Sequence, residues 1–136
     1  MDAPNVDVPD GFSPHFRKSG LTDPWEPLFS KKTDEKVVIG LRARDAHCNS
    51  RGMVHGGLIA ALADNAMGLS CAVQIGKGLV TVNLTTDYMG AAKLGQWIEF
   101  DTDYTKTGRS ICFAQCFITA DDATIARANA TFKVTD

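Results

Sequence analysis

The sequence predicts an α+β domain in which one curved antiparallel sheet of about six strands wraps around a single long central helix. Three observations favour this class. Residues 54–74 form one long apolar stretch with helical spacing. Two segments with strand-like alternation precede this stretch and four follow it. The breaks between the later strands are short, which predicts an antiparallel meander.

The chain before the long helix divides into an extension and two strands. Residues 1–26 carry four of the five prolines and little periodicity, so we expect an N-terminal extension with a short helical turn around residues 13–20. The single domain then spans residues 27–136. Its first two strands are expected at residues 28–33 and 36–44, and the segment 45–53 is expected to be a loop.

The long helix is expected to begin at residues 54–56 and to end near Gln74, where glycines suit a C-cap and turn. Apolar side chains lie on nearly all of its faces, which predicts that the helix is buried inside the protein. Two polar residues in its middle, Asp64 and Asn65, argue against a membrane span.

The last four strands are expected at residues 79–89, 96–107, 110–120 and 124–134. In the final strand, Ala126, Ala128 and Ala130 share one face, and Ala114 adds another small side chain. Such small residues let a helix pack closely against the sheet.

Composition excludes several function classes. The chain has 136 residues, is 44% hydrophobic and 22% charged, and carries a formal net charge of −2, so nothing suggests binding to nucleic acid or to a membrane surface. The N-terminus has neither the basic nor the apolar region of a signal peptide. No CxxC pattern occurs, so we expect free thiols and a cytoplasmic protein, the cysteines being Cys48, Cys71, Cys112 and Cys116.

Asp64 is the residue that needs an explanation, because burying a carboxylate is costly unless it is paired or neutral. A zinc site from His47, Cys48, His55 and Asp64 matches no usual ligand spacing, so we expect no metal. A Cys48–His55 nucleophile stays open, whereas the G-x-S-x-G elbow of a serine hydrolase is missing. Asp64 is then either a general base or nucleophile, or a side chain that only bonds the backbone.

The glycines at the helix start supply backbone N–H donors for the carbonyl group that Asp64 would act on. Gly56 and Gly57 expose backbone N–H groups at the positive end of the helix dipole, which suits a developing oxyanion. His55 precedes Asp64 by nine residues, so the two lie on opposite faces and about 13 Å apart along the axis. If both ends serve one site, a second copy of the helix must complete it, which predicts a dimer.

The residues Asn49, Gly52, His55, Gly56, Gly57 and Asp64 spell N-x-x-G-x-x-H-G-G-x-x-x-x-x-x-D. This pattern resembles that of the PaaI-type branch of the hotdog-fold acyl-CoA thioesterases, also described as 4-hydroxybenzoyl-CoA thioesterase-like or THEM2-like. The resemblance runs from about residue 27 to the end and includes "YMGAAKLG" and "ARANATFKV".

The resemblance implies hydrolysis of an acyl-CoA to a free acid and coenzyme A, without a metal or other cofactor. Carried over by position, Asp64 is the catalytic carboxylate, either nucleophile or general base, and the Gly56 N–H polarises the thioester carbonyl. Asn49 is implied to orient the thioester or water, and His55 to shape the helix start. Thr81 is implied to position the water.

Thr81, Asn83 and Thr85 also alternate in sequence, which by itself predicts one polar strand face. A solvated edge of the sheet is the alternative explanation.

The resemblance also implies where substrate and partners bind. The turn 105–110 lies where the family binds coenzyme A phosphates, so Lys106, Arg109 and Ser110, with Gly57, are candidate substrate-binding residues, although two cations are also common in a solvated turn. Family members form homodimers that commonly pair into homotetramers, with sites across the dimer interface. The acyl group stays open.

Two other functions fit the same fold. A hotdog hydratase or dehydratase would need His55 to act beside the carboxylate across the interface, and its signature is a change in enoyl absorbance rather than free thiol. A non-catalytic acyl-CoA sensor would need an output module, for which the N-terminal extension is too short and too rich in proline.

Overall fold

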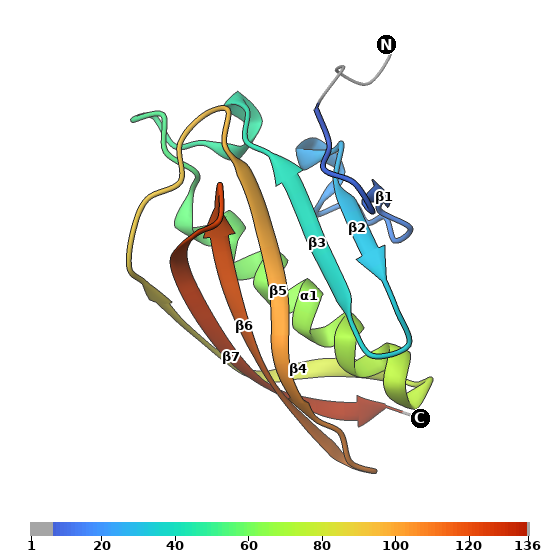
Figure 1. The fold of residues 1–136 in the computed structure, drawn as a ribbon. Coiled ribbons are helices and arrows are strands. Elements are labelled where there is room, and N and C mark those ends of the chain that lie inside the picture. Colours follow the sequence, from blue (N-terminus) through green and yellow to red (C-terminus); the bar gives the residue numbers. More distant parts are fainter. Residues whose placement is uncertain (1–6, 136) are drawn as a thin grey trace.

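A computed structural model describes residues 7–135 and shows one long helix against a curved, seven-stranded antiparallel sheet (Figure 1). The predicted α+β, hotdog-type fold class is confirmed, with one strand more than expected. The elements in chain order are β1 Ser13–Pro14, the 3₁₀ helix η1 Asp23–Trp25, β2 Phe29–Lys32, β3 Val37–Arg42, the 3₁₀ helix η2 Asp45–His47, α1 Gly56–Ile75, β4 Gly78–Tyr88, β5 Trp97–Lys106, β6 Ile111–Ala120 and β7 Ala123–Thr135.

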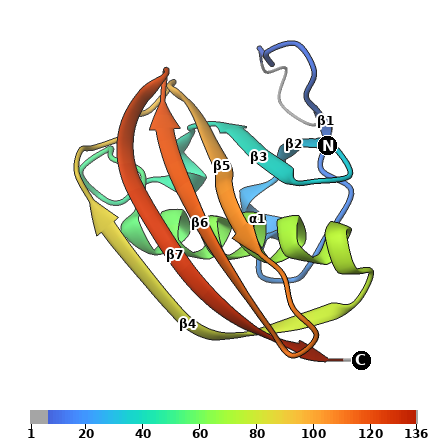
Figure 2. The same cartoon turned by 60° about the horizontal axis from the view of Figure 1, so that its bottom comes forward.

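The strand order is β1-β2-β3-β5-β6-β7-β4, so the predicted meander holds for β5 to β7 and is wrong for β4. The helix explains the difference. At about 1.5 Å per residue, α1 carries the chain across the concave side of the sheet to its far edge, where β4 pairs with β7 (Figure 2). The connection after β4 then returns to β5 beneath the helix start, where the Val54 N–H donates to the Ala92 carbonyl oxygen at 2.8 Å.

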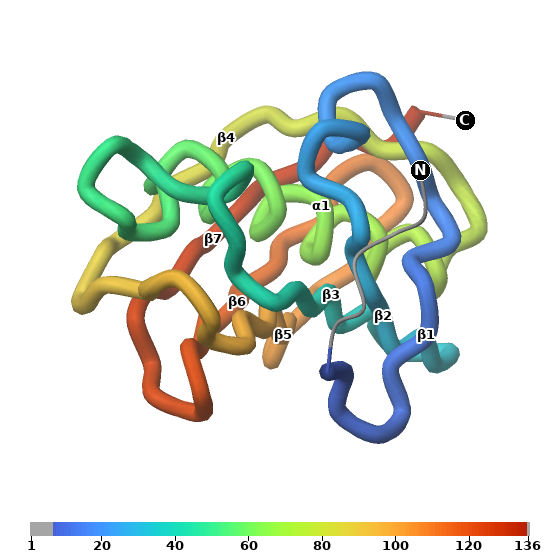
Figure 3. The backbone as a smooth tube through the Cα atoms, turned by 90° about the horizontal axis from the view of Figure 1, so that it is seen from above, coloured from blue at the N-terminus to red at the C-terminus, as the bar shows by residue number. Residues whose placement is uncertain are grey.

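The seventh strand comes from the segment predicted as an extension. Ser13 and Pro14 pair with β2, and the Phe12 ring contacts the Trp97 ring at a centroid distance of 5.1 Å. The predicted helical turn over residues 13–20 is wrong, because this stretch begins as an edge strand and the 3₁₀ turn comes later, at η1. The segment between β1 and β2 reaches the side of α1 that the sheet leaves open (Figure 3).

The central helix α1 lies where the sequence predicts it, with its N-cap at His55 and a left-handed C-cap at Gly76 (φ 67°). The expectation that it is buried on all sides is wrong within one chain, because a single curved sheet covers only one side. By length and hydropathy alone α1 could cross a membrane, but its packing identifies it as the core helix. Its buried residues are Leu58, Ile59, Leu62, Ala63, Ala66, Met67, Ser70 and Cys71.

The alanine face of the last strand packs as predicted. Ala126 and Ala128 are fully buried, and Ala130 and Ala114 are each 4% exposed, in the core that also contains the inner face of α1. The small side chains let the helix approach the sheet closely, which positions the elements of the candidate site.

Gly40 in β3 marks a second close approach. A Cβ at this position would lie 2.4 Å from Cζ2 of Trp97 and 2.9 Å from Cε1 of Phe12. We therefore expect Gly40→Ala to lower the free energy of unfolding by about 1–3 kcal/mol, measured by urea denaturation, since a packed core resists added volume. Gly20→Ala is the matched control, because a Cβ there meets nothing within 4 Å. Equal stability of the two variants would contradict the prediction.

Candidate active site

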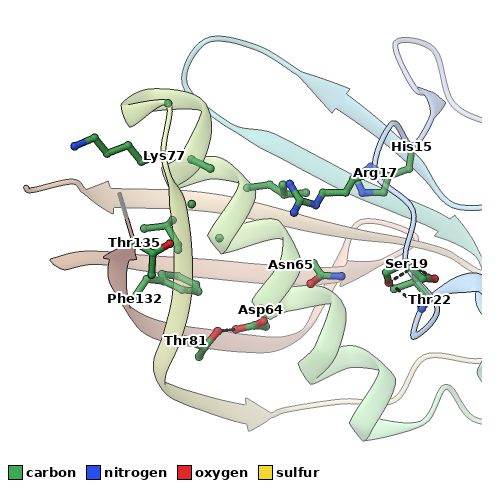
Figure 4. Close-up of a pocket in the computed structure, with 16 residues that line it drawn as sticks. His15, Arg17, Ser19, Thr22, Asp64, Asn65, Lys77, Thr81, Phe132 and Thr135 are labelled. Carbon is green, nitrogen blue, oxygen red and sulfur yellow. Dashed lines mark hydrogen bonds between the residues drawn. The ribbon is translucent and has the colours of Figure 1, made fainter. Parts of the chain in front are cut away.

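Asp64 lies on the side of α1 that the sheet does not cover and lines a pocket of about 550 Å³ between α1, β4 and residues 15–22 (Figure 4). The Thr81 hydroxyl of β4 donates a hydrogen bond to Oδ1 of Asp64 at 2.6 Å. Asp64 is only half-buried, so the expectation of a buried carboxylate is wrong for the isolated chain. The sequence shows an apolar helix around Asp64, but not which side of that helix one sheet can cover.

A β-bulge in β4 aims Thr81 at the helix. The backbone of Thr81 pairs opposite the buried Phe132. After a register shift, Asn83 pairs opposite Thr131 on the outer face of the sheet. Thr85, opposite Asn129, also lies on the outer face. The predicted common face of Thr81, Asn83 and Thr85 is therefore wrong, because the extra residue in the bulge reverses the alternation.

The start of α1 is held by two side chains. Nδ1 of His55 accepts a hydrogen bond from the Gly57 N–H at 2.8 Å, which makes His55 the N-cap. The Tyr88 hydroxyl of β4 donates to the Gly56 carbonyl oxygen at 2.5 Å. Within residues 7–135 no acceptor takes the Gly56 N–H, which points out from the positive end of the helix dipole.

Asn49 precedes the helix in a tight loop. Its Oδ1 accepts hydrogen bonds from the backbone N–H groups of Arg51 at 2.9 Å and Met53 at 3.2 Å. The loop also needs Gly52, whose φ of 76° favours glycine. The side-chain oxygen is thus used for structure, and only the amide NH₂ of Asn49 remains for a substrate or water.

The structure brings Asp64 and Thr81 together but does not bring either to Asn49, His55, Gly56 or Gly57. Asp64 follows Gly56 by eight positions in one continuous helix, which is about 12 Å along the axis. None of the residues at the helix start lines the Asp64 pocket. Within one chain, the Asp64–Thr81 pair and the helix start are therefore two separate groups of candidate residues.

Three of the candidate substrate-binding residues surround the turn between β5 and β6, and Lys106, Arg109 and Ser110 are all exposed. Arg109 lines a second pocket, of about 450 Å³, at the C-terminal end of α1, together with Lys77. Ser110 uses its carbonyl oxygen to accept a hydrogen bond from the Val134 N–H at 2.8 Å. Arg109 therefore lies beside the end of the helix, whereas Lys106, whose backbone pairs with that of the exposed Phe113, lies on the outer face of the sheet.

Comparison with known proteins identifies the fold's family. Residues 51–126 match the thioesterase superfamily. The chain is also 35% identical over 132 residues to a candidate esterase, PA0474 of Pseudomonas aeruginosa, with 95% of this chain and 98% of that protein covered. The chain belongs to the thioesterase superfamily. The predicted PaaI-type, THEM2-like family and the predicted thioester hydrolase are thereby confirmed.

Two further relatives of this thioesterase are informative. Human acyl-coenzyme A thioesterase 13 is 35% identical over 86 residues, which cover 62% of this chain and 61% of the human protein. A hypothetical thioesterase from Streptococcus pneumoniae TIGR4, whose structure contains coenzyme A, superposes with a TM-score of 0.72 and 26% identity, covering 82% of this chain and 90% of the other.

The geometry disfavours the alternative chemistry that the sequence left open. Burial and the nearby Asp45 raise the pKa of the Cys48 thiol, which weakens it as a nucleophile, and Nδ1 of His55 is occupied by the Gly57 N–H. His47 is fully buried, with Nδ1 accepting from the Arg44 N–H and Nε2 donating to the Trp25 carbonyl oxygen. Among residues 7–135, no three His, Cys, Asp or Glu side chains are grouped to hold a metal ion.

Four residues at this thioesterase site were missed by the sequence analysis: His15, Arg17, Lys77 and Tyr88. His15, Arg17 and Lys77 line the Asp64 pocket, and Tyr88 fixes the helix start. Tyr88 lies in "YMGAAKLG", a stretch quoted for the resemblance, but nothing in the sequence connects it with Gly56. The position of Arg17 depends on tertiary packing and has no local signal.

Proposed function

We propose that this thioesterase hydrolyses an acyl-CoA thioester to a free acid and coenzyme A, with Asp64 as nucleophile or general base. The observation that supports this proposal most directly is the 2.6 Å hydrogen bond between Thr81 and Asp64 on the open side of α1. It joins a carboxylate to a hydroxyl that can also hold a water molecule, inside a pocket large enough for part of a thioester. The acyl-coenzyme A named for the human relative supports the substrate class.

Hydrolysis of a thioester needs a nucleophile that attacks the thioester carbon and a thiol that leaves. Either water attacks the thioester carbon while Asp64 accepts its proton, or the Asp64 carboxylate attacks and water later hydrolyses the resulting anhydride. In both routes the carbonyl electrons move to oxygen, which a Gly56 N–H stabilises. The C–S bond then breaks with its electron pair on sulfur, and coenzyme A leaves as the thiol once protonated. Asn49 NH₂ would hold the thioester or water.

We infer that the working form is a homodimer. Strand β4 is the edge of the sheet opposite β1, and it exposes 51% of Val80 and 63% of Val82. A second copy seated along this edge would cover the open side of α1 and place its own helix start beside Asp64. Exposed Tyr104, Ile111 and Phe113 on the outer face of the sheet offer a further surface, by which dimers would pair into a homotetramer in the cytoplasm.

The test is free thiol release from a panel of short aliphatic, longer aliphatic and aryl-acetyl CoA thioesters. Stoichiometric thiol and free acid from at least one of them supports the proposal. A change in enoyl absorbance without thiol release would instead indicate a hydratase, and tight binding of acyl-CoA without any product would indicate a sensor.

Replacing Lys106 and Arg109 together by Ala is expected to raise KM for an acyl-CoA about tenfold or more, and to leave KM for the matching pantetheine thioester unchanged. The reason is that both are exposed cations that flank the turn between β5 and β6 and would meet phosphates, which pantetheine lacks. Steady-state kinetics on the two substrates measure the difference. Lys133→Ala, at an exposed cation of β7, is the control. Equal changes on both substrates would show a structural role for the turn.

A further inference from the structure

Residues 15–22, between β1 and η1, form one wall of the Asp64 pocket. His15, Arg17, Ser19 and Thr22 line the pocket, opposite α1. Figure 4 shows Arg17 extending from this wall toward the helix, on which Asn65 faces Ser19 and Thr22. This wall belongs to the segment that the sequence analysis regarded as an extension.

The wall is anchored on both sides of Arg17. Before it, the His15 N–H donates to the Leu28 carbonyl oxygen at 2.9 Å, and the His15 side chain is only 5% exposed. After it, the Asp23 N–H donates to the Ser19 carbonyl oxygen at 3.0 Å, and the hydroxyls of Ser19 and Thr22 are hydrogen-bonded at 3.0 Å. The backbone therefore presents Arg17 to the pocket at a defined place.

The pocket has more positive than negative charge. Asp64 is its one acidic lining residue, whereas Arg17 and Lys77 are both cationic. Neither cation has an ion-pair or side-chain hydrogen-bond partner in the part of the chain that the structure describes, residues 7–135. Burial lowers the pKa of His15, which favours its neutral form, and Arg17 is the cationic side chain of the wall that lines the pocket.

The pocket follows α1 from the Asp64–Thr81 pair past Leu69 and Ala72 to Lys77, which also lines the second pocket with Arg109. In Figure 4 the Lys77 side chain extends away from Arg17, so Arg17 is the cation that faces the helix. The apolar side chains along this path suit an uncharged chain, and the guanidinium suits a carboxylate or phosphate that such a chain carries.

We propose that Arg17 forms an anion subsite of the Asp64 pocket that binds a negatively charged group of the substrate. The group is either a phosphate of coenzyme A or a carboxylate at the far end of the acyl group. The inference rests on the proposed function for the identity of the substrate, but its physical content is the binding of an anion at Arg17.

Three non-hydrolysable thioethers separate the two sources. S-pentyl-pantetheine carries neither anion, S-pentyl-CoA carries only the phosphates, and S-(4-carboxybutyl)-CoA carries the phosphates and a terminal carboxylate. Calorimetry gives Kd for each with the parent protein, Arg17→Gln, Arg17→Lys and Lys77→Gln. The matched control is Lys18→Gln, since the Lys18 ammonium lies 3.3 Å from Glu26 and outside the pocket.

Arg17→Gln is expected to weaken binding of an anionic probe about tenfold, with Arg17→Lys recovering part of the loss and Lys77→Gln giving a smaller one. A loss on both CoA probes but not on S-pentyl-pantetheine assigns the subsite to a phosphate. A loss confined to S-(4-carboxybutyl)-CoA assigns it to an acyl carboxylate. No loss on any probe, an equal loss on all three, or the same loss in Lys18→Gln overturns the proposal.

Failure of the subsite and failure of the proposed function give different results. If Arg17 discriminates the probes but no acyl-CoA yields free thiol, the hydrolytic function falls and the subsite stands. If thiol release is normal but Arg17→Gln binds every probe as the parent does, the function stands and the subsite falls.

Discussion

Asp64→Asn is expected to lower kcat for thioester hydrolysis by about 10²- to 10⁴-fold, the range that a positioned proton acceptor contributes. The amide cannot take a proton from water or attack a thioester, yet its Oδ1 can still accept the Thr81 hydroxyl that lies 2.6 Å from Asp64. The loss should therefore appear in turnover and not in folding. Single-turnover kinetics and the thermal midpoint, Tm, measure the two effects separately.

The control for this substitution is Asp34→Asn, which removes an exposed carboxylate in the turn between β2 and β3. It changes the net charge by the same amount and should leave kcat at the parental value. If Asp64→Asn retained turnover within a few-fold of the parent while remaining folded, Asp64 would have only a structural role, as a hydrogen-bond acceptor for Thr81.

The position of Asp64 on the helix could be predicted from sequence because the determinants are local. Apolar spacing defines α1, His55 caps it and Gly76 ends it, so the observed Gly56–Ile75 agrees with the expected residues 54–74. The strands on either side follow from alternation in the same way. These signals need no knowledge of where one element lies relative to another.

The features that the sequence did not predict depend on long-range packing. Strand β4 pairs with β7 at the far edge, although short breaks suggested consecutive neighbours. The bulge that turns Thr81 toward α1 has no glycine or proline to mark it, because Val82 is an ordinary strand residue. Arg17 reaches the pocket only because His15 is anchored beside β2.

The half-exposed state of Asp64 also depends on long-range packing, and it bears on the proposed function. An apolar helix with one side uncovered by its own sheet is incomplete as a folding unit, and the open edge of β4 borders the same side. The sequence showed an apolar helix that must be covered, whereas the structure shows which side of that helix its own sheet leaves open. In the homodimer that we propose, the same association would bury Asp64 and complete the site.

The shared site gives the last prediction. We expect each site to take Asn49 and Gly56 from one subunit and Asp64 with Thr81 from its partner, since the two halves lie about 12 Å apart along α1. A mixed dimer of an Asp64→Asn chain and an Asn49→Asp chain should then recover about half of the parental activity, one site in two being intact.

The choice of Asn49→Asp follows from the loop geometry. Aspartate keeps the Oδ1 acceptor that Arg51 and Met53 use, at 2.9 Å and 3.2 Å, and replaces the NH₂ donor with a negatively charged oxygen that cannot donate. The reciprocal control pairs a parental chain with a chain that carries both substitutions. Shared sites make this dimer inactive, because each of its two sites then has one defect. Sites built within single chains would reverse both results, so that the doubly substituted pairing would be half-active and the complementing pairing inactive.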